Sequence, residues 1–311
     1  NLNTATGYQA LSGNTISYYN TAYGARALMG NISNTTGRNT AVGYEALLRN
    51  TTSSNTEVGA SALSLNSTGG SNTAVGNNAL KNNDTGFGNT ATGDNALSNT
   101  TGSYNTAYGT FALSANTSGP SNTAVGYNAL FSNNGVVGGS TAVGLRALEL
   151  NTSGNANTAV GSSALRTNTI GTYNTALGYG ADVTSNNLSN TTALGYGAQV
   201  NASNKVRIGN TAVTIIEGQV AWSFPSDARL KENVVDYKPG LDFITRLRPI
   251  TYNLKSDTTQ KITHSGFIAQ EVEAIGIPFY GINKPANKDD YYSLAYSEFV
   301  VPLVNAVKEL K

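Results

Sequence analysis

The sequence contains no cysteine, and only 12% of its 311 residues are charged. Without cysteine the chain can form neither a disulfide framework nor a thiolate metal or redox site. The net charge of +1, with no basic stripe, argues against a nucleic-acid partner. No apolar run approaches the roughly 18 residues of a membrane span, and no polybasic cluster suggests an anchor. We therefore expect neither nucleic-acid binding nor membrane insertion.

The composition changes near residue 218. Of the 34 glycines, 30 lie in residues 1–218, whereas 22 of the 37 charged residues lie in the shorter remainder. We expect two domains, 1–218 and 219–311, that follow different folding rules. The first residues, "NLNTATGYQAL", lack the features of a signal peptide and lie inside a repeat, so we expect a fragment of a longer protein.

A nine-residue segment recurs along the first domain. Its clearest copies are "NTAVGYEAL" (39–47), "NTAVGNNAL" (72–80), "NTATGDNAL" (89–97), "NTAVGYNAL" (122–130) and "NTAVGSSAL" (157–165). Twelve repeat glycines fall 16 to 19 residues apart, and "NKVRIGN" (204–210) is a degenerate thirteenth unit. A helix pair needs about 34 residues, so this period favours one coil of a β-solenoid with two short strands and two turns.

Alternation within "NTAVG" divides each strand into two faces. Thr and Val share one face, which we expect inside the solenoid because branched side chains pack well there. Ala and Gly share the other, which would allow close approach of a second backbone. Each coil offers little apolar volume, so we expect a symmetric oligomer packed along the Ala/Gly face.

Two surface features of the repeat have alternative interpretations. The Asn-x-Thr/Ser triplets suggest glycosylation sites, but we favour Asn and Thr stacking between coils to satisfy backbone groups. The recurring tyrosines either cover the solenoid or form a sugar-binding surface; they are Tyr8, Tyr23, Tyr44, Tyr108, Tyr127, Tyr179 and Tyr196. Only seven acidic residues precede residue 219, and their scatter argues against a glycosidase carboxylate pair.

The second domain has helical and extended patterns. "SDARLKENV" places Ser226 as a helix N-cap, followed by the acidic Asp227. Pro249 favours an extended run through Tyr252, and "HSGFIAQEVEAIG" indicates an amphipathic helix. "YSLAYSEFVVPLVNAVKEL" has the longest helical pattern, with Pro302 near its start or at a kink. Its apolar stripe fits a short coiled coil.

Ser226 and Lys231 are candidates for a nucleophile and its base. A serine hydroxyl needs a base to take its proton, and serine–lysine dyads do this without histidine. Five residues of one straight helix would separate the two side chains by about 140°, so a turn at Ser226 or a partner chain must bring them together. The alternative is that Ser226 only caps a helix and Lys231 is a solvated charge.

Two parts of the chain resemble known families. The "TAVG" units and "NKVRIGN" resemble the left-handed β-roll head of trimeric autotransporter adhesins, which implies a trimer. "SDARLKENV", "GFIAQEVEAI" and "YSLAYSEFVVPLVNAVKEL" resemble the intramolecular chaperone domain of endosialidases and tail fibres, the peptidase S74 domain. That resemblance implies a mainly α (α+β) domain that trimerises, templates the preceding fibre and then cuts itself off before the motif serine.

Mapped onto this sequence, the resemblance makes Pro225–Ser226 the scissile bond, with Ser226 and Lys231 as a single-turnover dyad. His264, Gln270 and Glu271 are candidate auxiliary residues, while Asp227 is expected to be a helix-start carboxylate rather than a catalytic acid. No cofactor or metal is expected. Cleavage that depends on the trimer would wait until assembly is complete.

The function that follows is a homotrimeric phage tail fibre or adhesin-like shaft, on a virion or another extracellular surface, that sheds its chaperone. A host-surface glycan or protein is its expected receptor. The alternatives are a depolymerase of surface polysaccharide and a bacterial surface adhesin that binds glycans through the β-roll.

Overall fold

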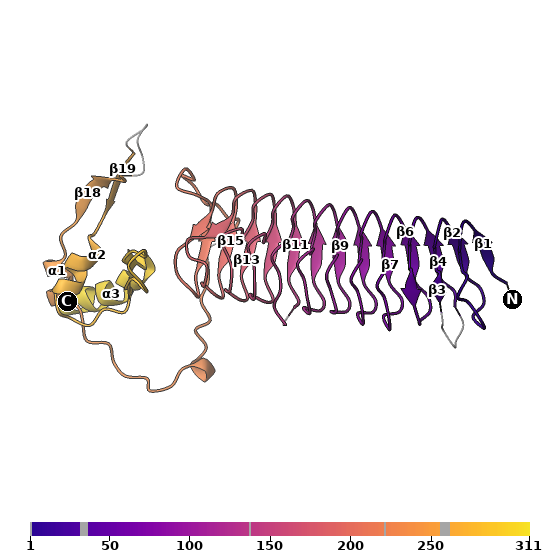
Figure 1. Ribbon diagram of the computed structural model, residues 1–311. Helices are drawn as coiled ribbons and strands as arrows, with labels where there is room; N and C mark the ends of the chain where they lie inside the picture. The colour runs from indigo at the N-terminus through magenta and orange to yellow at the C-terminus, as the bar shows by residue number, and fades with distance from the viewer. Residues whose placement is uncertain (1, 32–36, 137, 221, 256–261) are drawn as a thin grey trace. The chain divides into compact units, whose positions relative to one another are not determined.

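The computed structural model describes residues 2–31, 37–136, 138–220, 222–255 and 262–311. The chain divides into two compact units, Asn1–Asn210 and Thr211–Lys311 (Figure 1). The boundary expected from composition, after residue 218, falls within the second unit. None of the helices in the described ranges is long and apolar enough to cross a membrane.

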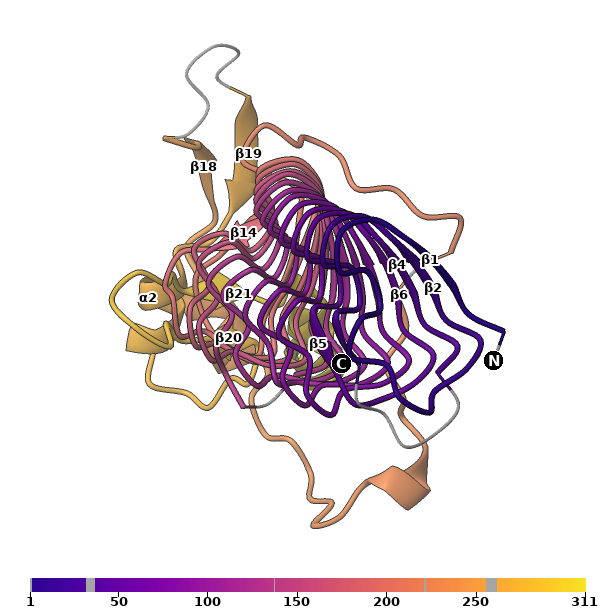
Figure 2. The ribbon, with the colours of Figure 1, turned by 45° about the vertical axis from the view of Figure 1, so that its right-hand side comes forward.

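The first unit is a β-solenoid built on one parallel sheet of 13 strands, whose coils stack along the shaft in Figure 2. Equivalent residues of successive coils pair in register, for example Thr123 with Thr141 and Ala124 with Ala142. The strands are β1 (Thr4–Thr6), β2 (Thr21–Tyr23), β4 (Thr40–Val42), β6 (Thr56–Val58), β7 (Thr73–Val75), β8 (Thr90–Thr92), β9 (Thr106–Tyr108), β10 (Thr123–Val125), β11 (Thr141–Val143), β12 (Thr158–Val160), β13 (Thr175–Leu177), β15 (Thr192–Leu194) and β17 (Val206–Ile208). The degenerate thirteenth unit therefore forms the last rung, as predicted.

The predicted orientation of the strand faces is wrong. The central Ala of each regular strand is buried, as Ala41, Ala74 and Ala124 show, while the flanking Thr and Val point outward. The interior is filled instead by this Ala and by the Ala–Leu pair that ends each repeat. Because each coil is short, its opposite walls lie close together, and the central position of the strands of this sheet is Ala from β1 to β15, except for Glu57 in β6.

The period suggests two strands per coil, one on each wall of the solenoid. The wall opposite the 13-stranded sheet forms far fewer strands than one per coil. In the described part of the first unit it contains the pairs β3 (Gly30–Asn31) with β5 (Arg49–Asn50) and β14 (Asp182–Val183) with β16 (Gln199–Val200), and one isolated bridge between Arg49 and Leu65. In the first ten coils a Leu interrupts the extended backbone, with a φ between 46° and 55°. A left-handed residue costs about 1–2 kcal/mol, which the burial of a Leu side chain offsets with about 1.5–3 kcal/mol.

The repeat glycine is required by the distance between coils. Gly126 has a φ of 133°, and a Cβ on it would lie 2.5 Å from the carbonyl oxygen of Gly144 in the next coil. No side chain tolerates both conditions, because the backbone region favours glycine and the clash is with main chain. The regular spacing of glycine in the sequence therefore follows from the close backbone contact between successive coils.

Buried asparagines form ladders along the solenoid axis. Each asparagine that precedes a strand offers its Oδ1 to the backbone N–H of its equivalent one coil later, for example Asn55 to Asn72 at 2.9 Å. A second ladder joins side chains directly, as in the 2.9 Å bond from Asn133 Nδ2 to Asn116 Oδ1. Asn116 and its equivalents Asn66 and Asn83 belong to Asn-x-Thr/Ser triplets but are fully buried. Stacking is therefore the correct interpretation for these triplets.

The second unit is a small mixed domain. Its elements are η1 (Ala228–Leu230), α1 (Leu241–Arg246), β18 (Ile250–Asn253), β19 (Thr263–Gly266), α2 (Ala269–Ala274), β20 (Ile282–Asn283), β21 (Ser293–Leu294), η2 (Tyr296–Phe299) and α3 (Val300–Glu309). β18 pairs antiparallel with β19, and β20 with β21. A core of Phe243, Val272 and Phe299 joins α1, α2 and η2. The extended run after Pro249 and the C-terminal helix are confirmed, with Pro302 in the first turn of α3.

Candidate self-cleavage site

Residues 226–231 form one tight turn. Asp227 caps the 3₁₀ turn η1 by accepting a 2.8 Å hydrogen bond from the backbone N–H of Arg229. The turn is closed by two backbone bonds, from Leu230 N–H to Asp227 O at 3.0 Å and from Lys231 N–H to Ala228 O at 3.2 Å. The prediction that Ser226 is the N-cap is therefore wrong, because the carboxylate of the next residue takes that position.

The turn brings Ser226 and Lys231 together. The Nζ of Lys231 donates a 2.7 Å hydrogen bond to the Oγ of Ser226. Two features shorten the path between these residues: the chain makes only one 3₁₀ turn, and Lys231 then leaves it in an extended conformation with a φ of −114° and a ψ of 137°. A continuous α-helix would point the two side chains apart. A 3₁₀ turn followed by an extended residue therefore brings together two side chains that are five residues apart.

Both members of the pair lie in solvent. Ser226 and Lys231 are exposed, as are Pro225 and the remaining residues from 222 to 236. Within residues 222–255 and 262–311, no backbone N–H or side chain donates a hydrogen bond to the carbonyl oxygen of Pro225. The chain therefore places a serine–lysine contact next to the Pro225–Ser226 bond, in a segment whose described residues are all exposed.

An ion pair occupies the outer side of the turn. The guanidinium of Arg229 donates hydrogen bonds to the Asp227 carboxylate, from Nη2 to Oδ2 at 2.7 Å and from Nε to Oδ1 at 3.0 Å. The hydrogen bond from the Arg229 side chain, followed by that from its backbone N–H, lowers the pKa of Asp227 below its ordinary value. Asp227 is therefore a carboxylate at the start of the turn, and its two oxygens are directed at Arg229.

His264 lies in strand β19, away from the hydrogen bonds of the turn. It pairs across the sheet with Tyr252 and is half-buried. The two rings stack, with centroids 5.6 Å apart and planes inclined by 27°. In the described part of the second unit no hydrogen bond or ion pair connects His264 to Ser226 or Lys231. The contact with Tyr252 accounts for the imidazole in this protomer, and a catalytic role for it stays a prediction.

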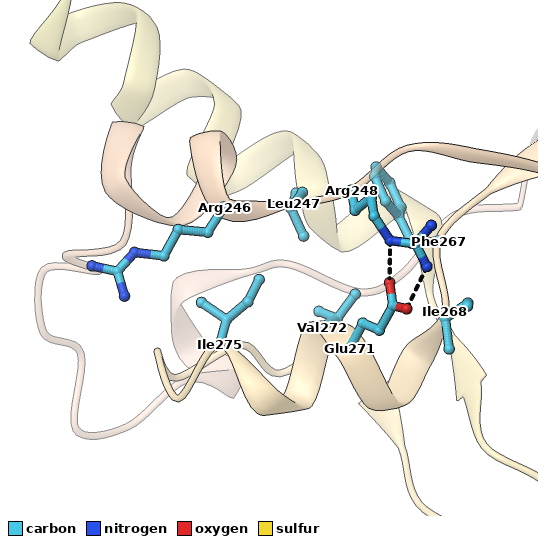
Figure 3. A pocket seen from close by; sticks show the side chains of 8 residues that line it. All are labelled: Arg246, Leu247, Arg248, Phe267, Ile268, Glu271, Val272 and Ile275. Carbon is cyan, nitrogen blue, oxygen red and sulfur yellow. Dashed lines mark hydrogen bonds and ion pairs between the residues drawn. The ribbon is translucent and has the colours of Figure 1, made fainter.

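Gln270 and Glu271 lie in helix α2, and Glu271 lines a pocket (Figure 3). The carboxylate of Glu271 pairs with the guanidinium of Arg248 through two nitrogens, and the Arg248 Nε to Glu271 Oε2 distance is 3.0 Å. This hydrogen bonding raises the pKa of Arg248. Figure 3 shows the pair at one end of a pocket that Leu247, Val272 and Ile275 line with apolar side chains. No bond among the described residues links this pair to the Ser226–Lys231 contact.

Sequence reasoning did not single out Arg229 or Arg248. A signal for Arg229 was present, since a basic residue two positions after an N-cap Asp can pair with that carboxylate. Arg248 offered no such signal, because its partner is 23 residues away and only the packing of α2 beside α1 brings them together.

Comparison with known proteins finds a family match in part of the second unit. Residues 226–282 match the peptidase S74 family, described as the chaperone of endosialidase. The match begins at Ser226 and includes the turn, His264, Gln270 and Glu271. No curated protein matches the chain. The architecture is therefore a β-solenoid followed by a chaperone-of-endosialidase segment.

Proposed function

We propose that the chain forms a trimeric fibre whose C-terminal unit drives assembly and then releases itself by cutting the Pro225–Ser226 bond. The observation that carries this proposal is the 2.7 Å contact between Lys231 Nζ and Ser226 Oγ. It lies at the first residue of the segment that matches the chaperone family. The family match supports a chaperone with self-cleavage, and the contact supplies the residues that would perform it.

The position of Ser226 after the scissile bond favours an acyl shift. Its Oγ attacks the carbonyl carbon of Pro225 through a five-membered ring while the base takes the hydroxyl proton. The C–N bond then breaks, the nitrogen of Ser226 leaves as an amine after gaining a proton, and Pro225 is held as an ester on Oγ. Water hydrolyses that ester to the Pro225 carboxylate and the free hydroxyl. Each chain cuts one bond once, which makes the reaction single-turnover.

The base in this scheme requires a drier site than one protomer provides. An amine in water is protonated near neutral pH, with an ordinary pKa of about 10.4, and must be desolvated to accept a proton. Every residue of the turn is exposed. We infer that a partner subunit covers it and supplies donors for the developing oxyanion, as acyl transfer requires. Cleavage would then follow assembly.

Two exposed apolar surfaces support the trimer. On the solenoid, the outward Thr/Val face is continuous along the sheet, with Val58 at 41%, Tyr108 at 60% and Leu177 at 48% exposure. On α3, the stripe consists of Val300, Leu303, Val304, Val307 and Leu310, all exposed. Because Ala is inside the coil, the Thr/Val face replaces the Ala/Gly face as the surface for self-association. Continuous apolar surfaces of this kind mark interaction sites.

The glycan-binding alternatives differ in support. A depolymerase needs two carboxylates at a shared site, but Glu45 and Glu149 are paired with arginines and Glu57 is buried. An adhesive surface has better support, because Tyr179 and Tyr196 stack at 5.8 Å and remain 62% and 69% exposed. A glycan array probed with the released shaft, beside a Tyr179→Ala/Tyr196→Ala double variant, tests this alternative.

The decisive experiment is mass spectrometry of the purified full chain. We expect one product that ends at Pro225 and another that begins at Ser226. Ser226→Ala and Lys231→Ala should remain uncut, whereas Ser223→Ala, which removes a nearby exposed hydroxyl, should be cut like the wild type. Cleavage of the Ser226→Ala or Lys231→Ala chain at the wild-type rate would disprove the dyad.

A further inference from the structure

The Asp227–Arg229 ion pair makes more side-chain hydrogen bonds than any other pair of described residues in the proposed cleavage turn. Asp227 accepts four hydrogen bonds from this one residue: one from the backbone N–H and three from the guanidinium, at distances from 2.7 to 3.1 Å. Two-point contact between a guanidinium and a carboxylate fixes orientation as well as distance. A lysine at position 229 could not reproduce this geometry, because its single ammonium is a point charge.

The turn has little else to hold it. Its three residues, Ala228–Leu230, are closed by only two backbone hydrogen bonds, and no side chain from 222 to 236 is buried among the described residues of that segment. A single turn without packing is unstable in water, because helix nucleation is unfavourable. Relaxed to an extended chain, five residues would span roughly 16 Å, and Lys231 would lose contact with Ser226.

We propose that Asp227 and Arg229 are positioning residues for self-cleavage, because their ion pair holds the turn that carries Lys231 Nζ to Ser226 Oγ. This inference rests on the proposed function. Neither residue touches the reacting atoms, so both act through the geometry of the pair that does. The proposal gives Arg229, whose role the sequence left open, a specific task at the site.

The ion pair has a second consequence for Lys231. The other charged side chains of residues 222–236 are Asp227, Arg229, Glu232 and Asp236, and every described residue of that segment is exposed. With Arg229 present, the negative charge of Asp227 is already matched. Without it, the Asp227 carboxylate would add an unmatched negative charge to the turn that holds the proposed base, so we expect cleavage to need a higher pH.

The test compares full-length variants by cleavage rate, pH–rate profile and oligomeric state. We expect Arg229→Gln to form the same oligomer as the wild type, to cleave about 10- to 100-fold more slowly, and to shift its pH–rate profile upward. The matched control is Arg246→Gln, which breaks another exposed Asp–Arg pair, with Asp242 in α1, and should cleave like the wild type. The double variant Asp227→Asn/Arg229→Gln should recover the wild-type pH profile while remaining slow.

Rates are compared within the oligomeric fraction. If Arg229→Gln does not assemble, Arg229→Lys takes its place, since it keeps the charge and loses only the two-point geometry. The positioning role would be overturned if the assembled Arg229 variant cleaved at the wild-type rate and with the wild-type pH–rate profile. Cleavage that still depended on Ser226 would leave the proposed function intact. Absence of Ser226-dependent cleavage in the wild type would overturn both.

Discussion

Glu57 is a carboxylic acid in the interior of the solenoid, and replacing it should stabilise the shaft. It occupies the position that Ala holds in the neighbouring coils, between Ala41 and Ala74 in the sheet. Its side chain is fully buried, and neither carboxyl oxygen has a hydrogen-bond partner among the described residues. Desolvation alone raises its pKa well above 4.5, with no charged group opposing the shift.

The magnitude follows from this environment. An unsatisfied buried polar group costs about 1–3 kcal/mol, so Glu57→Ala should raise the free energy of unfolding by about that amount while the folded carboxyl keeps its proton. At higher pH the benefit grows. Above pH 4.5 the unfolded chain releases the proton and the folded chain retains it, so wild-type stability falls by at most about 1.4 kcal/mol per pH unit. The fall ends at the raised folded pKa.

The assay is urea unfolding of the full chain from about pH 4 to pH 8 at one protein concentration, because association also shifts apparent stability. Amide hydrogen exchange within the coil of Glu57 reports local opening, which repeat proteins allow. Glu57→Gln separates the cost of the unsatisfied polar group from the pH-dependent loss of stability, since it keeps an unsatisfied polar group but does not titrate. Parallel pH dependence in wild type and Glu57→Gln, or a loss of stability in Glu57→Ala, would refute the reasoning.

The remaining predictions concern the coil contact, the trimer and the chaperone. Gly126→Ala should lower shaft stability by about 1–3 kcal/mol or more, and more than Gly139→Ala, since position 139 has a positive φ but open space around its Cβ; thermal unfolding measures both. Val307→Asp should abolish the proposed trimer in light scattering while Lys308→Ala on the same helix retains it, because Val307 is 66% exposed in the single chain; a trimeric Val307→Asp would exclude the α3 interface. Deleting residues 226–311 should give aggregated or monomeric shaft by the same method, beside an uncut Ser226→Ala control, and a soluble trimer would argue against the chaperone role.

Much of the fold follows directly from the sequence. The repeat period, the glycine spacing and the turn segments predicted a solenoid and its thirteenth rung, because every coil repeats the same local contacts. The same regularity identified the Asn stacking. The two strands per coil were not found, since left-handed leucines such as Leu130 and Leu148 break one wall, and backbone conformation at a buried Leu is not visible in an apolar pattern.

The sequence selected the residues of the proposed site but not their geometry. Ser226 and Lys231 could be selected by motif, yet a separation of five residues fits neither a helix nor a strand that would join them. The Asp227–Arg229 pair holds the turn that brings Lys231 to Ser226. Asp227, and not Ser226, caps this turn because its carboxylate accepts the backbone N–H of Arg229. The contact of Glu271 with Arg248 arises from packing between elements distant in sequence.

The sequence by itself determined the number and spacing of the coils, the change of architecture after the repeats, and the residues at the proposed cut. The tertiary structure decided which strand face is inside, because that depends on the distance between the two walls of a coil and not on the preference of Thr or Val for a strand. It also decided that Lys231 meets Ser226, because a side-chain ion pair holds a turn that local propensity alone does not specify.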